Sequence, residues 1–330
     1  MKKIKLSINS PKEGLLRQTP NNDGVWGDYK FIINEEVNEC DFWVIYSKGQ
    51  KQVDTCKVGP ENFIFLSGEP EPIYHYSQSF INKFAKVITS RRDIQHSNIT
   101  HLHPSQPWWV GRKMKENGDI EFGLNFNDFN NIKPIKKTKL ISVISSNKGF
   151  TKGHKDRIKF VQQLKDHFGD SLDVFGKGIN GFEDKWDTLK DYKYHIVIEN
   201  SSYPDYWTEK LADSFLSESF PFYHGCKNLE KYFSENSYEI IDIYDINKSI
   251  EIIKSGIHNK IYENRFDDIL DAKQKVLNEH NIFPMLTQIC DNMDISKPKK
   301  EITIKHEMSY FDFYKIPMLI KRFYYKFLTK

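Results

Sequence analysis

The chain has 330 residues, of which 38% are hydrophobic and 14% aromatic, and its formal net charge is +3. This length suffices for two domains of ordinary size or one large domain, and the apolar residues suffice for real cores. The small net charge excludes a polycation, and the interleaving of basic with acidic residues argues against nucleic-acid binding. The four cysteines form no CxxC pair, which argues against a zinc knuckle or a disulfide framework and fits a reducing compartment.

The start of the chain is basic, Met1-Lys2-Lys3, but the apolar segment after it is far too short for a signal peptide. No window approaches the ~20 apolar residues that a membrane-spanning helix needs. We therefore expect a cytoplasmic protein.

The first 136 residues predict a domain of strands joined by loops. Apolar runs predict strands at 3–8, 31–33, 42–46, 62–66 and 86–89, and helical spacing predicts a helix over 76–84. The segment 67–72 cannot be regular structure because it holds two prolines. His101 and His103 have no partner at ligand spacing, so two loop histidines are favoured over a metal site. The Pro107-Trp108-Trp109 segment predicts a packed aromatic wall, with an acceptor groove as the alternative.

The polar stretch 127–138 predicts a domain boundary, after which strands and helices alternate. Strands are predicted at 140–144, 172–175, 196–198, 220–223 and 239–243, with helices near 154–168, 184–189, from 207 on, 227–233 and 245–254. Residues 257–290 have a helical pattern. Regular alternation of this kind predicts a parallel sheet covered by helices, which we place in a second domain over 137–290.

The turn between the strand at Ile196 and the next helix carries the strongest functional signal. Glu199 and Asn200 follow the strand, and the carboxyl edge of a parallel sheet is where open α/β folds bind ligands. Asp205 or Thr208 is expected to cap the helix. A cation in the first helical turn, such as Lys210, opposes the helix dipole by roughly 0.3–1 kcal/mol unless an anion is held there. This pattern predicts a phosphate site, and the alternative is that Lys210 simply lies on the surface.

Two further segments invite a phosphate interpretation. Gly176 to Gly181 matches G-x-G-x-x-G, but a strand–helix unit already precedes it and only a short helix follows. A glycine-rich turn near a nucleotide is therefore favoured over NAD(P) or FAD binding. Ser146 and Asn147, with Arg157 on the following helix, could cradle a diphosphate. The alternative is a solvated arginine on a lysine-rich helix.

The segment from Glu199 to Lys210, followed by a helix and by Phe220-Pro221-Phe222-Tyr223-His224-Gly225, resembles the signature of the family 10 glycosyltransferases. The matching residues are Glu199-Asn200, Asp205-Tyr206 and Thr208-Glu209-Lys210. Members of this family are α-1,3/1,4-fucosyltransferases that take fucose from GDP-fucose. The lack of a Golgi anchor and stem points to the bacterial members. The resemblance implies an α/β fold of the GT-B type, with two Rossmann-like domains facing each other across a cleft. Residues 1–136 would bind the acceptor and residues 137–290 the GDP-sugar.

The resemblance also implies roles for individual residues. The donor ligands would be Glu199, Asn200, Tyr206, Glu209 and Lys210, with Glu209 facing the ribose hydroxyls. Ser146, Asn147 and Arg157 would contact the diphosphate. The family does not depend on an Asp-x-Asp metal site, so we expect GDP-fucose as a substrate and no metal or tightly bound cofactor. Trp207 departs from the family, which often has an aliphatic residue there.

An inverting transferase needs a base that takes the proton from the acceptor hydroxyl. Glu69 follows a glycine after a predicted strand of the first domain, and the family places its proposed base in a similar Gly-Glu context. Glu69 is therefore the predicted base, with Glu71 in reserve. The alternative is that both are exposed loop carboxylates.

The predicted function is transfer of fucose from GDP-fucose to a hydroxyl of an acceptor glycan, an oligosaccharide or a glycolipid. The family points to surface polysaccharide synthesis, such as lipopolysaccharide or capsule, or to protein glycosylation. Two alternatives remain: a GT-B enzyme that uses another nucleotide sugar, and a non-catalytic carbohydrate-binding protein of the same fold.

The last segment, 291–330, predicts a basic amphipathic tail. After Asp312 it carries five basic residues and no acidic one, and five apolar residues share one arc of a helix: Ile316, Leu319, Ile320, Phe323 and Phe327. Such an end suits docking on the anionic inner face of a bacterial membrane. Packing against the body of the protein or against another subunit is the alternative.

Overall fold

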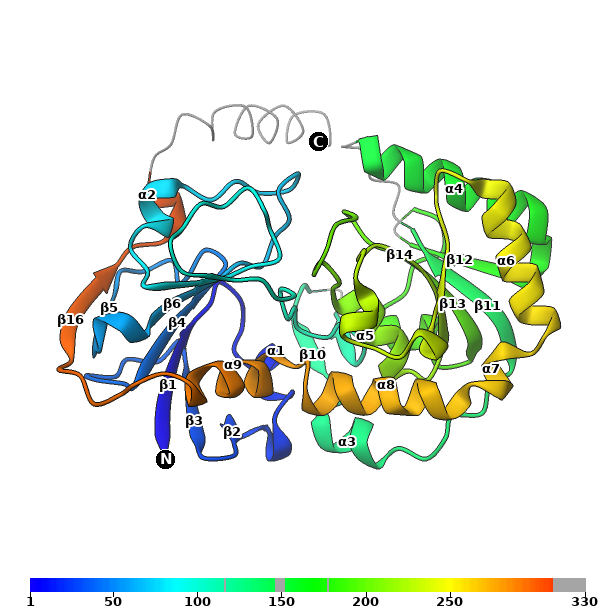
Figure 1. The fold of residues 1–330 in the computed structure, drawn as a ribbon. Coiled ribbons are helices and arrows are strands. Elements are labelled where there is room, and N and C mark those ends of the chain that lie inside the picture. The colour runs from blue at the N-terminus through cyan, green and yellow to red at the C-terminus, as the bar shows by residue number, and fades with distance from the viewer. Residues whose placement is uncertain (116, 146–151, 177, 311–330) are drawn as a thin grey trace. The chain divides into compact units, whose positions relative to one another are not determined.

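The computed structural model describes residues 1–115, 117–145, 152–176 and 178–310, which form two compact units (Figure 1). The first unit comprises Met1–Lys12, Asp23–Pro104 and the described residues from Leu286 on. The second comprises Glu13–Asn22 and Ser105–Met285.

This division differs from the boundaries predicted at 136 and 290. Residues 105–136 belong to the second unit because Asp213 accepts the backbone N–H of Trp109 at 3.0 Å and Asp184 accepts that of Gly111 at 2.9 Å. Arg17 then ties residues 13–22 to the same segment. Its guanidinium donates to the carbonyl of Val110 at 2.8 Å and that of Leu124 at 2.7 Å, and also to the carbonyl of Trp108. A buried arginine with carbonyl partners on distant segments leaves no periodic signal in the sequence.

The first unit is built on a seven-stranded sheet with the order β2-β3-β1-β4-β6-β7-β8. All neighbouring strands are parallel except β2 and β3. Its elements are β1 (Lys2–Ser7), β2 (Val25–Trp26), β3 (Tyr29–Ile33), β4 (Phe42–Tyr46), β5 (Asp54–Val58), β6 (Phe63–Leu66), α2 (Gln78–Ile81), β7 (Lys86–Ile88), β8 (Ile99–Thr100) and β16 (Lys300–Ile304). Every residue of β4 and β6 is buried, as a parallel strand covered on both faces requires. The five strands predicted here are confirmed.

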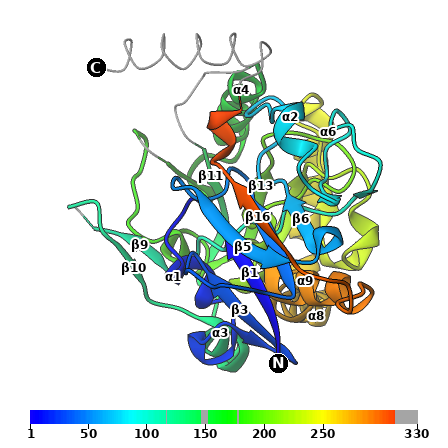
Figure 2. The ribbon, with the colours of Figure 1, turned by 90° about the vertical axis from the view of Figure 1, so that its left-hand side faces the viewer.

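Part of the predicted tail returns to this unit. Strand β16 pairs antiparallel with β5, and Ile302 lies opposite Cys56, as Figure 2 shows for the two strands side by side. Ile302 and Ile304 pack on the aromatic core that includes Trp43, Phe63 and Phe65. Residues 291–310 therefore do not form a separate tail, and the amphipathic segment after Asp312 lies outside the described residues.

The second unit holds a five-stranded, fully parallel sheet with the order β12-β11-β13-β14-β15. Its elements are α1 (Glu13–Leu16), β9 (Arg112–Met114), β10 (Ile120–Phe122), α3 (Phe126–Asn131), β11 (Lys139–Ile144), α4 (Lys152–Phe168), β12 (Leu172–Phe175), β13 (Tyr192–Ile198), α5 (Glu209–Leu216), β14 (Phe220–His224), β15 (Glu239–Ile240), α6 (Ile246–His258), α7 (Ile261–Asn264) and α8 (Phe266–Asn278); α9 (Ile282–Asp291) leads into the first unit. The strands predicted here are confirmed, and so is the α/β class with a parallel sheet in each unit. The helices predicted at 184–189 and 227–233 are only the short 3₁₀ helices Lys185–Thr188 and Leu229–Lys231.

The strand order of the second unit fixes where a ligand can bind. From β11 the chain moves outward through α4 to β12, and from β13 it moves the other way through α5 to β14. Right-handed crossovers then place α4 and α5 on opposite faces of the sheet, as Figure 1 shows. A crevice opens at the carboxyl ends of β11 and β13, where the strand order reverses.

Candidate donor-binding site

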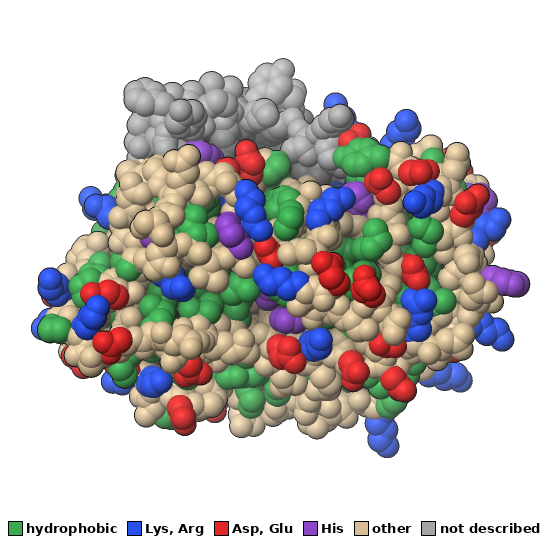
Figure 3. Space-filling view, in the orientation of Figure 1, with side chains coloured by type: hydrophobic (Ala, Val, Ile, Leu, Met, Phe, Trp, Pro, Cys, Tyr) green, Lys and Arg blue, Asp and Glu red, His purple; other side chains and the backbone are tan. Residues whose placement is uncertain are grey.

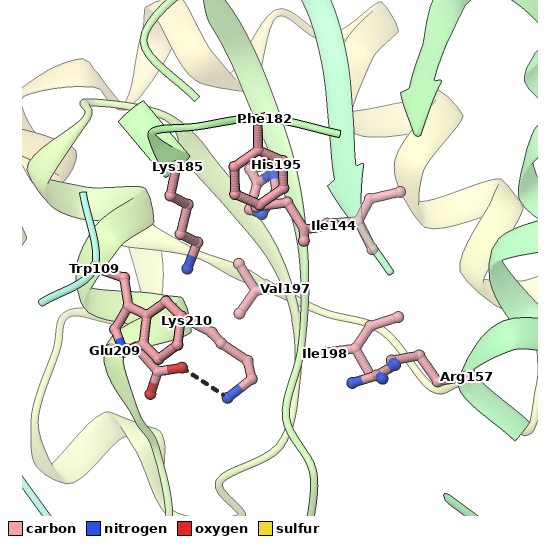
Figure 4. Close-up of a pocket in the computed structure, with 11 residues that line it drawn as sticks. Trp109, Ile144, Arg157, Phe182, Lys185, His195, Val197, Ile198, Glu209 and Lys210 are labelled. Atoms are coloured by element: carbon pink, nitrogen blue, oxygen red, sulfur yellow. Dashed lines mark hydrogen bonds and ion pairs between the residues drawn. The ribbon is translucent and has the colours of Figure 1, made fainter. Parts of the chain in front are cut away.

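A pocket lies at this reversal point and belongs entirely to the second unit (Figure 4). Its cavity volume is about 210 Å³. It is lined by the end of β11, the second half of β13, the start of α5, one residue of α4 and three residues from loops and a short helix: Ile144, Ile196, Val197, Ile198, His195, Glu209, Lys210, Arg157, Trp109, Phe182 and Lys185. Three of these side chains, Arg157, Lys185 and Lys210, are cationic, and one, Glu209, is acidic.

The turn between β13 and α5 is held by a buried carboxylate. Glu199 accepts a hydrogen bond from the Thr208 backbone N–H at 2.8 Å and another from the Thr208 hydroxyl at 2.7 Å. Thr208 is the N-cap residue of α5, so one of the two predicted caps is confirmed. Glu199 thus fixes the first turn of the helix that carries Glu209 and Lys210, and it lies beneath the pocket rather than in its lining.

Asp205, the other predicted cap, anchors the same turn from the opposite side. It is buried with a φ of 63°, a left-handed conformation that aspartate tolerates better than most residues. Its carboxylate accepts hydrogen bonds from Tyr232 at 2.6 Å, Lys231 at 2.9 Å and Asn228 at 3.1 Å. The signature segment is therefore fixed by buried hydrogen bonds before any ligand arrives.

Lys210 is surrounded by acceptors that the protein itself supplies. Its ammonium lies 3.0 Å from Thr208 Oγ1, 3.1 Å from Glu209 Oε1 and 3.3 Å from Glu199 Oε2. Burial disfavours the charged form of an ammonium, but the two carboxylates outweigh it and raise the pKa of Lys210. The sequence argument required an external anion to stabilise this cation, and the structure shows that two internal carboxylates do so.

The two carboxylates differ in their surroundings. Burial raises the pKa of Glu199 even though Lys210 opposes it. Burial also acts to raise the pKa of Glu209, but Lys210 and Lys185 outweigh it and lower the pKa. Glu209 Oε2 is buried and has no hydrogen-bond partner among the described residues. Glu209 lines the pocket, so this oxygen is a buried acceptor beside the cavity that the described residues leave unused.

The other predicted donor ligands take different positions. Arg157 lines the pocket from α4 and donates to Asn200 Oδ1 at 3.2 Å, so these two predicted residues are brought together. Burial lowers the pKa of Arg157, and Glu199 opposes this. Tyr206 is buried, stacks on Tyr203 and is not in the pocket lining. Ser146 and Asn147 lie outside the described residues, and the roles predicted for all of these residues stay predictions.

Sequence reasoning missed a second cluster in the pocket. Lys185 forms an ion pair with the fully buried Asp213, with Nζ 2.8 Å from Oδ2. Asp213 Oδ1 also accepts the backbone N–H of Trp109 at 3.0 Å. His195, in the middle of β13, lines the pocket beside them. The available signal was His195 directly before the apolar run 196–198, since Lys185 and Asp213 are remote from each other in sequence.

Two exposed aromatic side chains also line the pocket. Trp109 is 46% exposed and Phe182 is 38% exposed, although large aromatic side chains are usually buried. The aromatic wall predicted at 107–109 is thus divided, because Trp108 is buried and only Trp109 lines the pocket.

The predicted base lies in the first unit. Glu69 is half-buried just after β6, and Glu71 is exposed. The backbone N–H groups of Gly68 and Glu69 both donate to the Tyr76 hydroxyl at 3.2 Å. A Cβ on Gly68 would lie 3.2 Å from the Cβ of Ser47, so glycine allows this turn its close approach to the neighbouring loop. Glu69 therefore stands at the carboxyl edge of a parallel sheet, where its role as base stays a prediction.

The two remaining sequence motifs are the glycine-rich turn and the histidine pair. Gly176 and Asn180 form an isolated bridge, and the next helical segment is the short 3₁₀ helix Lys185–Thr188, so no dinucleotide-binding helix follows. His101 contacts the Thr89 carbonyl. Within the described ranges, no group of three or more His, Cys, Asp or Glu residues is placed to hold a metal ion.

The surface charge and the helix lengths bear on binding to nucleic acid and to membranes. On the face drawn in Figure 3, basic and acidic side chains are interspersed among the described residues. No helix in the described part of the chain is both long and apolar enough to cross a bilayer.

The site is that of an α/β protein with a cation-lined pocket at the reversal point of a parallel sheet. The sequence profile described as "Glycosyltransferase family 10 (fucosyltransferase) C-term" matches residues 134–304, more than half of the chain. The chain therefore belongs to glycosyltransferase family 10.

Individual relatives match over shorter stretches. The α-(1,3)-fucosyltransferase FucT of Helicobacter pylori is 29% identical over 98 residues, which cover 28% of this chain and 20% of that protein. A human 4-galactosyl-N-acetylglucosaminide 3-α-L-fucosyltransferase is 35% identical over 77 residues, which cover 23% of this chain and 20% of that protein. The matches thus span about a fifth of the length of these relatives. A crystal structure of an α1,3-fucosyltransferase aligns with 86% of this chain and 91% of its own, at 16% identity and a TM-score of 0.48.

Proposed function

We propose that this protein is an inverting fucosyltransferase that moves fucose from GDP-fucose to a hydroxyl of an acceptor glycan. The observation that carries this proposal is the pocket of the second unit, which Arg157, Lys210 and Glu209 line at the reversal point of the sheet. Membership of a family whose profile is described as that of fucosyltransferases supports fucose as the transferred sugar.

In this proposal the nucleoside diphosphate lies with its diphosphate at the carboxyl edge of the sheet and its ribose beside Glu209. Arg157 and Lys210 lie at the carboxyl edge, where they face the diphosphate and stabilise the charge that grows on it as the sugar leaves. Glu209 Oε2 accepts a ribose hydroxyl. Lys210 keeps its internal carboxylate partners, so it acts as a fixed positive charge.

In the proposed reaction, the acceptor hydroxyl attacks the anomeric carbon of fucose and its proton passes to Glu69. The bond from that carbon to the diphosphate oxygen breaks, and GDP leaves with the electron pair. Attack opposite the leaving group inverts the anomeric configuration. Asn200, Tyr206, Ser146 and Asn147 complete the donor site in this proposal, and the expected acceptor is a surface polysaccharide precursor that contains N-acetylglucosamine.

Calorimetry with GDP, GDP-fucose, GDP-mannose and UDP-sugars tests the donor site. We expect the parent protein to bind GDP and GDP-fucose, and we expect Arg157→Gln to weaken both. Preference for a UDP-sugar, or no nucleotide binding, would overturn the donor assignment.

The base is tested with Glu69→Gln and its neighbour Glu71→Gln as the matched control. Loss of one general base lowers turnover by about 10²–10⁴-fold, so we expect GDP release in the presence of an N-acetyllactosamine acceptor to fall by this factor in Glu69→Gln alone. GDP binding should not change in either variant. Equal activity in both variants would remove Glu69 as the base.

A further inference from the structure

His195 is a buried polar residue of the pocket that the reaction described above does not use. It is 3% exposed and lies on β13, three residues before the end of the strand at Ile198. A strand rises ~3.3 Å per residue, so His195 lies roughly 10 Å from the carboxyl edge at which Arg157 and Lys210 stand. This is about the distance that separates the base of a nucleoside diphosphate from its phosphates. Figure 4 shows His195 and Lys185 at one end of the pocket and Glu209 and Lys210 at the other.

The neighbours of His195 fix which ring nitrogen carries the proton. Nδ1 lies 2.8 Å from the hydroxyl oxygen of Ser142, and that hydroxyl donates its single proton to the carbonyl of Thr188 at 2.9 Å. A carbonyl cannot donate, so both contacts are satisfied only if Nδ1–H donates to Ser142. Nε2 then has no proton.

The protonation state of the ring agrees with this geometry. Burial, and secondly the Lys185 cation, lower the pKa of His195 well below its ordinary value, so the ring is neutral at physiological pH. Among the described residues Nε2 has no hydrogen-bond partner, and His195 lines the pocket. Nε2 of His195 is therefore a hydrogen-bond acceptor that is fixed in the pocket and available to a donor on a ligand.

Lys185 places donors next to this acceptor. Its ammonium has three N–H groups, and one is directed to Asp213. The ammonium of Lys185 has no other hydrogen-bond partner in the described ranges, and the side chain lines the pocket. The exposed ring of Phe182 lies at the same end of the pocket and provides an apolar surface (Figure 4).

We infer that His195 reads the base of the donor nucleotide, accepting a hydrogen bond at Nε2 from the ring N1–H of guanine while Lys185 donates to the neighbouring carbonyl oxygen O6. This assignment rests on the GDP-sugar binding proposed above. Adenine and cytosine present a bare ring nitrogen and an amino group at the corresponding positions, so they would meet Nε2 and the ammonium with the wrong polarity. His195 is thus a specificity-determining residue that excludes these two bases.

The test compares GDP with two analogues, N1-methyl-GDP and 7-deaza-GDP, by calorimetry on the full chain. Methylation at N1 removes the proposed donor, whereas 7-deaza-GDP has CH in place of N7 and keeps both N1–H and O6. An unmet hydrogen bond in a buried site weakens binding by about ten- to hundred-fold. We expect the N1-methyl analogue and ADP to bind the parent more weakly than GDP by at least this factor, and 7-deaza-GDP to lose far less.

Two variants connect the effect to His195. His195→Phe keeps a ring of similar shape but removes the acceptor, so GDP and its N1-methyl analogue should bind with nearly equal, weakened affinity. His195→Gln places an amide oxygen near the position of Nε2 and should retain part of the preference for GDP. The thermal melting of both variants reports whether they fold.

The outcomes separate the two proposals. If the parent binds GDP and its N1-methyl analogue equally, the role of His195 is wrong while the donor site stands. If both variants prefer GDP over its N1-methyl analogue as strongly as the parent does, another residue recognises N1–H of the base. If the parent binds no nucleoside diphosphate at all, the proposed function itself fails.

Discussion

Lys210 is the residue for which the structure makes the sharpest prediction. Its ammonium is the counter-charge of two carboxylates, and Glu199 is fully buried beneath it. The substitution Lys210→Met keeps most of the aliphatic stem but leaves both carboxylates without the cation. We therefore expect a large loss of stability in the second unit, even in the absence of any ligand.

The magnitude follows from the burial of the cluster. Removing one partner of a buried ion pair costs about 3–5 kcal/mol because the remaining charge is left uncompensated. The Lys210 side chain is 23% exposed, so water replaces part of the lost interaction and we take about 2–4 kcal/mol. For a unit of this size each kcal/mol lowers the melting temperature by roughly 2–4 °C. The expected decrease is therefore about 5–15 °C.

The loss should depend on pH and on Glu199. Burial already raises the pKa of Glu199 in the folded protein, and removal of Lys210 raises it further. A carboxyl group whose pKa is raised in the folded state lowers the free energy of unfolding once the pH rises above its pKa in the unfolded state. The difference in stability between Lys210→Met and the parent should therefore become smaller as the pH falls towards the pKa of a free carboxyl group. The double variant Lys210→Met/Glu199→Gln should recover part of the loss at neutral pH, because it removes the uncompensated charge.

Thermal and urea unfolding of ligand-free protein measure these effects, with Lys254→Met as the control. Lys254 is exposed on α6 and forms no ion pair with any described residue, so its substitution should change stability by less than about 0.5 kcal/mol. The reasoning is refuted if Lys210→Met lies within about 1 kcal/mol of the parent and the double variant is no more stable than the single one.

Two further predictions concern the same unit. Gly225→Ala should lower stability by at least about 1–3 kcal/mol in urea unfolding, because a Cβ there would overlap the Tyr223 hydroxyl and the Glu199 side chain. Gly181→Ala is the matched control, since a Cβ there has nothing within 4 Å, and equal losses in both would contradict the packing argument. The lowered pKa of His195 means that the unfolded chain binds one more proton below pH 6.5. This residue should therefore lower the free energy of unfolding by up to about 1.4 kcal/mol for each pH unit below 6.5. If the free energy of unfolding of His195→Gln falls with pH as steeply as that of the parent, His195 is not the group responsible.

Periodicity and apolar runs predicted most of both sheets. Strand β4 begins and ends where the sequence places it, because a fully buried parallel strand leaves a continuous apolar run. The bounds of β12 were also predicted, although only Leu172 of this edge strand is buried. Strand β5 was missed because Asp54–Val58 contains no apolar run: one of its three buried positions is Asp54, and its partner, β16, lies far along the chain.

The candidate site was predicted in its location but not in its electrostatics. The strand–turn–helix pattern placed Lys210 and Glu209 at the pocket. The carboxylate of Glu199 lies eleven positions before Lys210, and its approach depends on how the intervening turn folds. The pair of Lys185 and Asp213 likewise depends on the packing of a 3₁₀ helix against α5. Contacts of this kind follow from tertiary structure and leave no local pattern.

The discontinuous first unit has a consequence for synthesis on the ribosome. Every residue of the second unit has been made by Met285, whereas the first unit still awaits Leu286 and the residues after it. Strand β5 therefore has an open edge until Lys300–Ile304 leaves the exit tunnel and pairs with it. The unit that begins the chain is thus the last to be completed, and a nascent chain that stalls before residue 300 exposes an edge strand ready to associate with other chains.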